Sequence, residues 1–147
     1  MEVQVCTVPT TEHEMVEIRC HQIDDHVEEI VTFIKSRQGR LSGNLDGGIY
    51  EIPITDVLYI ESVDDRTFIY TQSQVYESRQ RIYELEEVLE HSHFIRISKS
   101  SIVNLLKIQS IRPALNGRFS ALLCNNEEVI ISRKYVADFK KALKGEG

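Results

Sequence analysis

The stretch Phe94-Ile-Arg-Ile-Ser-Lys-Ser-Ser-Ile-Val-Asn104 gives the clearest indication of the fold. Its first residues alternate between apolar and polar, with Ile95 and Ile97 on one face, which predicts a half-buried strand. Four polar residues, Ser98-Lys-Ser-Ser101, then interrupt the strand before apolar residues resume. Lysine and serine are donors suited to phosphate oxygens and base edges. The interruption is therefore either a binding loop or a solvated surface turn.

The composition is that of one globular domain with at most a small appended element. The 147 residues are 41% hydrophobic and 27% charged, which is enough to bury a core without disulfides. The three cysteines (Cys6, Cys20 and Cys124) are far apart and include no CxxC pair. No signal-peptide pattern or apolar run of membrane-spanning length occurs. We therefore expect a reducing, cytoplasmic location.

The net charge of −6 conceals a strong asymmetry along the chain. Residues 93–147 contain ten Lys and Arg against four Asp and Glu, a net charge of +6, so residues 1–92 carry −12. A basic end of this kind is typical of a surface that binds polyanions. The alternative is that the acidic and basic halves pair with each other within one fold.

The first 46 residues predict a small strand-helix-strand unit. Residues 16–21 alternate between apolar and polar and predict a short strand. Asp25 and Glu28 have capping-box spacing at the start of an amphipathic helix from Asp25 to Arg37. Arg40 to Leu45 predicts a second short strand. A partner or a second copy could dock on this unit.

From Gly47 onward the pattern is mainly β. Short apolar or alternating runs separated by turn residues predict antiparallel strands, and an amphipathic helix with an acidic, solvated outer face interrupts them. The predicted strands lie near residues 50–54, 57–60, 67–71, 94–97, 105–111, 119–124 and 129–131, the helix near 82–89, and the turns at Asp64-Asp65, Asn116-Gly117 and Asn125-Asn126. The fold class is therefore mainly β, or α+β when the helices are counted.

A closing helix follows Ser132, its expected cap, with Val136 and Phe139 on one face. Arg133 and Lys134 lie at its N-terminus, where the helix dipole is positive and disfavours cations. Cations beside free backbone N–H groups can form a phosphate site. Alternatively, both side chains extend into water.

Three stretches together resemble the LytTR family of bacterial DNA-binding domains: Ile54-Thr-Asp-Val-Leu-Tyr-Ile-Glu-Ser62, the Phe94–Asn104 stretch and Ile131-Ser-Arg-Lys-Tyr-Val136. The resemblance runs from about Gly47 to Leu143. It implies an elongated β-β-β sandwich of three small antiparallel sheets with short helices. It also implies a protein that reads successive major grooves through loops, without a recognition helix, and that bends DNA.

The resemblance also implies the DNA-binding residues. They are Arg66 and Thr67 in the first loop, Ser98 and Lys99 in the second, and Arg133 and Lys134 at the start of the last helix. Arg96 matches the same motif and either contacts DNA or supports the loop. Many members have His or Asn in the first two loops, whereas this chain has Thr67 and Ser98, so the base preference stays open.

Familiar members of the family carry a receiver domain in front, and the 46 residues here are too few for one. We therefore expect a stand-alone bacterial transcriptional regulator, with residues 1–46 for dimerisation or regulation and residues 47–147 for DNA binding. A homodimer would bind paired half-sites about one helical turn apart. Small regulators of this kind are often paired with a restraining membrane protein, which is a candidate partner by analogy alone.

Two other classes of function compete with DNA binding. An enzyme is not expected, because no GxSxG, HExxH, P-loop or GxGxxG motif occurs. His91-x-His93 offers only two metal ligands, so neither a metal site nor a cofactor is expected. The other class is a protein-interaction module whose basic face binds an acidic partner, without specific DNA binding.

Overall fold

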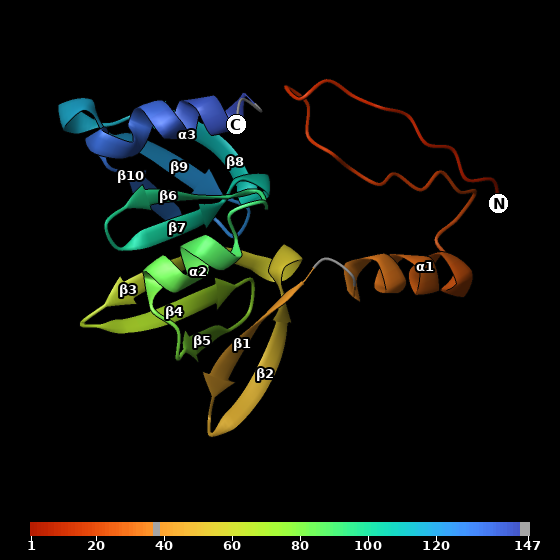
Figure 1. Ribbon diagram of the computed structural model, residues 1–147, viewed down its shortest axis with the longest axis horizontal. Coiled ribbons are helices and arrows are strands. Elements are labelled where there is room, and N and C mark those ends of the chain that lie inside the picture. The colour runs from red at the N-terminus through yellow and green to blue at the C-terminus, as the bar shows by residue number, and fades with distance from the viewer. Residues whose placement is uncertain (37–38, 145–147) are drawn as a thin grey trace.

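The computed structural model describes residues 1–36 and 39–144 (Figure 1). In these residues seven strands form one antiparallel sheet, in the order β2-β1-β5-β4-β3-β7-β6, and three form a second, in the order β10-β9-β8. The strands are β1 (Arg40–Leu45), β2 (Gly48–Pro53), β3 (Val57–Val63), β4 (Arg66–Thr71), β5 (Val75–Ser78), β6 (Phe94–Ser98), β7 (Ser101–Asn104), β8 (Ile108–Pro113), β9 (Phe119–Leu123) and β10 (Glu128–Ile131). The α-helices are α1 (Asp25–Ser36), α2 (Ile82–Val88) and α3 (Val136–Leu143), and short 3-10 turns include η2 (Leu105–Lys107), η3 (Leu115–Gly117) and η4 (Arg133–Tyr135). The expected mainly β class is confirmed.

Strand β3 is buried on both faces and separates two hydrophobic cores. Val57 and Ile60 pack in the first core with Leu85 of α2. Leu58 and Tyr59 pack in the second core, which the three-stranded sheet and α3 complete. The register with β4 shifts between Val57 and Tyr59, and such a bulge lets neighbouring residues face the same side. The continuous apolar run of β3 is thus the expected pattern of a strand covered on both faces.

Tyr59 connects the two sheets. Its hydroxyl donates a hydrogen bond of 2.7 Å to the carboxylate of Glu127, in the turn between β9 and β10, and its ring stacks on Tyr70 of β4 at 4.2 Å between centroids. Burial, and then the hydrogen bond to Glu127, raise the pKa of Tyr59 above its ordinary value. The phenol therefore stays protonated and remains a donor at neutral pH.

The expected hairpin turns are confirmed. Asp64 and Asp65 both have positive φ, at 51° and 63°, between β3 and β4. Asn116 and Gly117 have φ of 62° and 74° between β8 and β9. Aspartate, asparagine and glycine are the residues that adopt this left-handed conformation most readily, which is why these positions turn the chain.

Two features of the sheets differ from expectation. Two hydrogen-bonded sheets are present in the described residues, where the resemblance implied three. The β1–β2 hairpin joins the larger sheet because Asn44 pairs with Glu77 of β5, a single bridge between otherwise separate units. Strand β1 pairs along its whole length with β2, so it belongs to this sheet although the sequence placed it in the N-terminal unit.

The N-terminal unit also differs in detail. The strand expected at residues 16–21 is absent, and Val16 is 64% exposed, because no neighbouring strand pairs with this segment. The side chain of Asp24, and not that of Asp25, caps α1 by accepting a 3.0 Å hydrogen bond from the Val27 N–H. The expected helix end at Arg37 lies outside the described residues. No helix among the described residues is long and apolar enough to cross a bilayer.

We predict that Asn104→Ala destabilises the fold by about 2 kcal/mol, because it leaves a buried backbone carbonyl without its donor. Asn104 is 3% exposed, and its amide donates to the Val57 carbonyl at 2.9 Å while its side-chain oxygen accepts from the Leu106 N–H at 3.1 Å. Urea denaturation measures the loss, with Gln109→Ala on the exposed side of β8 as the control. Equal stability of the two variants would contradict the prediction.

Candidate nucleic-acid interface

Two hairpin turns meet at the same end of β3. Glu61 of β3 pairs with Ser101 of β7, and the Ser62 N–H donates to the Ser100 carbonyl at 2.8 Å. The β6–β7 turn therefore lies beside the last residues of β3, where the β3–β4 turn begins. In Figure 1 the tips of both hairpins point to the same side of the molecule. Backbone pairing thus brings the loops of Arg66 and Lys99 together.

The third loop joins this row through β6. The Ser132 N–H, just before η4, donates to the Ile97 carbonyl at 2.8 Å. This bond holds the start of η4 against the end of β6, next to Ser98. The N-terminal end of α3 accordingly lies on the side of the molecule to which the hairpin tips point (Figure 1). The structure brings the three sequence-predicted loops into one row.

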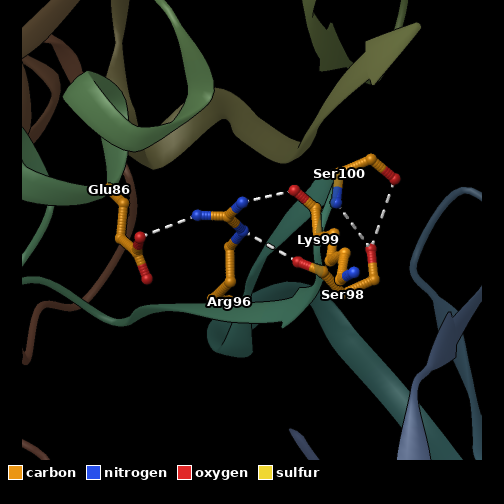
Figure 2. A network of polar contacts seen from close by, with 5 residues as sticks. All are labelled: Glu86, Arg96, Ser98, Lys99 and Ser100. Carbon is orange, nitrogen blue, oxygen red and sulfur yellow. Dashed lines mark hydrogen bonds and ion pairs between the residues drawn. The ribbon is translucent and has the colours of Figure 1, made fainter. Parts of the chain in front are cut away.

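Arg96 supports the second loop from inside. Its guanidinium donates to the Ser98 carbonyl at 2.8 Å and to the Lys99 carbonyl, and it forms an ion pair of 2.7 Å with Glu86 of α2 (Figure 2). The side chain is only 17% exposed. Each of the three guanidinium nitrogens therefore has an acceptor, and these bonds hold the turn in place. Of the two roles left open for Arg96, the geometry corresponds to loop support.

The hydroxyls of the second loop are used within the loop. Ser98 Oγ accepts the Ser100 N–H at 3.1 Å and lies 3.4 Å from Ser100 Oγ (Figure 2). Lys99 is exposed at the tip. The β6–β7 turn therefore presents one long cation on a backbone that Arg96 and Ser98 hold in place.

The two residues of the first loop differ in exposure. Thr67 is 3% exposed, so its side chain faces the protein interior and not the interface. Arg66 is exposed and forms a two-pronged ion pair with Glu77 of β5, at 2.6 Å and 3.1 Å, with its guanidinium 5.3 Å from the Phe68 ring centre. The hydrogen bond from Arg66 lowers the pKa of Glu77. Only Arg66 of this pair is available at the surface.

Arg133 and Lys134 lie in η4, one turn before α3 begins. Ser132 does not cap through its side chain; its carbonyl accepts the Tyr135 N–H at 2.8 Å instead. Within residues 1–36 and 39–144, Lys99, Arg133 and Lys134 form no ion pair, although the protein as a whole is acidic. Exposed cations kept away from carboxylates attract a polyanion at little desolvation cost.

Sequence reasoning missed two residues of this surface. Glu86 was assigned to a solvated helix face, but it is the ion-pair partner of Arg96. No sequence pattern distinguishes Glu86 from the other glutamates of α2, so its partner could not be predicted. Gly117 was assigned only to a turn, yet the side chain of Arg133 lies against it. Contacts of this kind depend on tertiary packing between segments far apart in the chain.

Comparison with known proteins agrees with this arrangement. Residues 47–144 match the family described as the LytTr DNA-binding domain. Two proteins of Staphylococcus aureus strains, each named as an uncharacterized HTH-type transcriptional regulator, are 32% and 31% identical over 130 residues, which cover 87% of this chain and 88% of theirs. A solved LytTr DNA-binding domain from Bacillus cereus superposes with a TM-score of 0.68 at 28% identity, over 71% of this chain and 96% of that one.

The fold and these matches define a class of DNA-binding domains, which is not an enzyme family. The chain belongs to the LytTr DNA-binding domain family. The relatives' names mention a helix-turn-helix, but in the described residues strands separate α1 from α2 and α2 from α3. The matched 130 residues exceed the family segment, so part of the N-terminal unit is shared with the Staphylococcus proteins.

We predict that Arg96→Lys loosens the β6–β7 turn without unfolding the protein, because an ammonium cannot reproduce the planar fork. Hydrogen exchange followed by mass spectrometry should show faster exchange in the peptide that covers residues 94–104. Arg112→Lys is the matched control, since Arg112 is an exposed arginine whose ion pair with Glu128 is 3.6 Å long. Unchanged exchange in Arg96→Lys, or equal acceleration in the control, would contradict loop support.

Proposed function

We propose that this protein is a bacterial transcriptional regulator that binds double-stranded DNA in a sequence-specific manner through its row of loops. The observation that carries the proposal is that backbone hydrogen bonds align the loops of Arg66, Lys99 and Arg133 at one end of the sheet. Loops that follow one another along an edge can enter successive major grooves, which are wide enough to admit protein and present a distinct pattern for each base pair. The protein would act in the cytoplasm, where bacterial DNA lies.

The loops would divide the work of binding. Arg133 and Lys134 would anchor phosphates, since they are exposed, unpaired in the described residues and next to a helix start. Lys99 and Arg66 would reach base edges. Lys99 would do so from a turn that Arg96 holds in place, and Arg66 would first break its ion pair with Glu77. Thr67, Arg96 and Ser98 would hold the loops in shape from within.

The proposal is tested by selecting binding sequences from a random duplex library and titrating the winner against scrambled DNA at two salt concentrations. We expect an enriched motif, repeated at helical spacing, and a steep salt dependence of about −0.9 in slope for each neutralised phosphate. No enrichment, with weak and salt-insensitive binding, would refute specific DNA binding and assign the basic face to an acidic protein partner.

We predict that Lys99→Ala costs about 1–3 kcal/mol on the selected duplex and flattens the preference over scrambled DNA, because a base contact is lost. Fluorescence anisotropy measures both affinities. Lys144→Ala, at the far end of α3, removes the same charge and should leave the preference intact. Equal weakening of Lys99→Ala on both duplexes would instead identify a phosphate contact.

We further propose that the segment before β1 joins two copies of the chain. Several of its apolar side chains are exposed, including Met15 at 78% and Ile23 at 76%, and α1 lies to the side of both sheets (Figure 1). Exposed apolar side chains gathered on one segment indicate a protein contact. A dimer would place two rows of loops on paired half-sites about one helical turn apart.

We expect the full chain to be a dimer and residues 39–147 to be a monomer in size-exclusion chromatography with light scattering. The shortened chain retains β1 and the whole family segment, so both sheets stay complete. A monomeric full chain would refute the dimer, and a dimeric shortened chain would move the contact to the sheets.

A further inference from the structure

The turn between β8 and β9 lies directly against the third loop. The side chain of Arg133 crosses Gly117 so closely that a methyl group on Gly117 would stand 2.9 Å from Arg133 Cδ and 3.1 Å from Cγ. Carbon atoms in contact prefer about 3.5–4.0 Å. Only a residue without a side chain leaves room for the Arg133 stem in this position.

The turn itself is well braced. The Ala114 N–H donates to the Arg118 carbonyl at 2.9 Å. The Nε of Arg118 donates to the Leu115 carbonyl at 3.3 Å. Asn116 and Gly117 both have positive φ. The surface under Arg133 is therefore a fixed backbone, while Arg133 is a flexible side chain that yields if the two collide.

We propose that the β8–β9 turn (residues 114–118) forms a seat, a fixed backbone surface that supports the Arg133 side chain and positions it for DNA. Gly117 is then a positioning residue of the interface. The inference rests on the proposed function and adds a fourth structural part to the row of loops. An arginine stem supported along its length loses less freedom when its guanidinium binds a phosphate. A side chain at position 117 would displace that stem and weaken binding without touching DNA.

The chain contains a matched control for this experiment. Gly47 lies in the two-residue turn between β1 and β2, likewise follows a residue with positive φ (Asp46, 49°), and has φ of 80° against 74° for Gly117. A methyl group on Gly47 would have no atom within 4 Å. Gly117→Ala and Gly47→Ala therefore both place an alanine at a similar positive φ, and only the first collides with Arg133.

The experiment compares affinity for the selected duplex in six proteins: wild type, Gly117→Ala, Gly47→Ala, Arg133→Ala and the two double variants with Arg133→Ala. We expect Gly117→Ala to bind about three- to tenfold more weakly, Gly47→Ala to bind as wild type, and Gly117→Ala to cause no further loss once Arg133 is alanine. Wild-type affinity of Gly117→Ala, an equal loss in Gly47→Ala, or a loss that persists without Arg133 would overturn the inference. So would wild-type affinity of Arg133→Ala.

A second measurement needs no DNA and separates this inference from the proposed function. The Nε–Hε resonance of Arg133 is the arginine signal missing from the Arg133→Ala NMR spectrum. It should shift in Gly117→Ala and not in Gly47→Ala, and an unshifted signal in both would refute the seat. If Gly117→Ala does not fold, Gly117→Asn and Gly47→Asn replace the alanine pair, because asparagine tolerates positive φ. If the wild type binds no DNA but the resonance shifts, the proposed function fails, while the positioning of the Arg133 side chain by Gly117 is still supported.

Discussion

The burial of β3 on both faces is the constraint on which the structure depends. Because Val57 and Ile60 face one core and Leu58 and Tyr59 face the other, the strand cannot slip by one residue without moving side chains from one core to the other. Its register is therefore fixed, and with it the register of β4 and β7 on either side. The turns at the end of β3 are therefore placed by the pairing of this strand with β4 and β7. The positions of the loops in the row are thus set by the core and not by the loops themselves.

The cations along the row of loops differ in whether they have a partner within the protein. Arg96 is 17% exposed, is held by backbone carbonyls and by Glu86, and supports the β6–β7 turn, whereas Arg66 is exposed and pairs with Glu77 at the surface. Lys99 and Arg133 have no such partner in the described part of the chain. A net charge of −6 is therefore compatible with polyanion binding, because its distribution, and not its sum, decides which face attracts phosphate.

The sequence allowed the class, most strands and the turns to be predicted, since these depend on local patterns of period 2 and on residues that tolerate positive φ. The three loops were expected as one set of DNA contacts only from the resemblance to the LytTR family. It could not assign the orientation of Thr67, because both faces of β4 are partly covered and alternation no longer distinguishes them. It predicted a strand at residues 16–21 from alternation alone, although a strand also needs a neighbour for its hydrogen bonds. The contacts of Arg133 with Gly117 and of Arg96 with Glu86 join segments distant in sequence, which no local pattern encodes.

The geometry also limits how much sequence one copy can read. Thr67 is buried and the Ser98 hydroxyl is engaged within its turn, so Arg66 and Lys99 are the side chains of the first two loops to which the proposed function assigns base reading. Two good contacts supply about 2–6 kcal/mol of discrimination. Specific regulators prefer their sites by about 4–10 kcal/mol, so one copy reaches only the lower part of that range. Two copies on one duplex would double the number of reading side chains, which is the physical advantage that the proposed dimerisation through the N-terminal segment would bring.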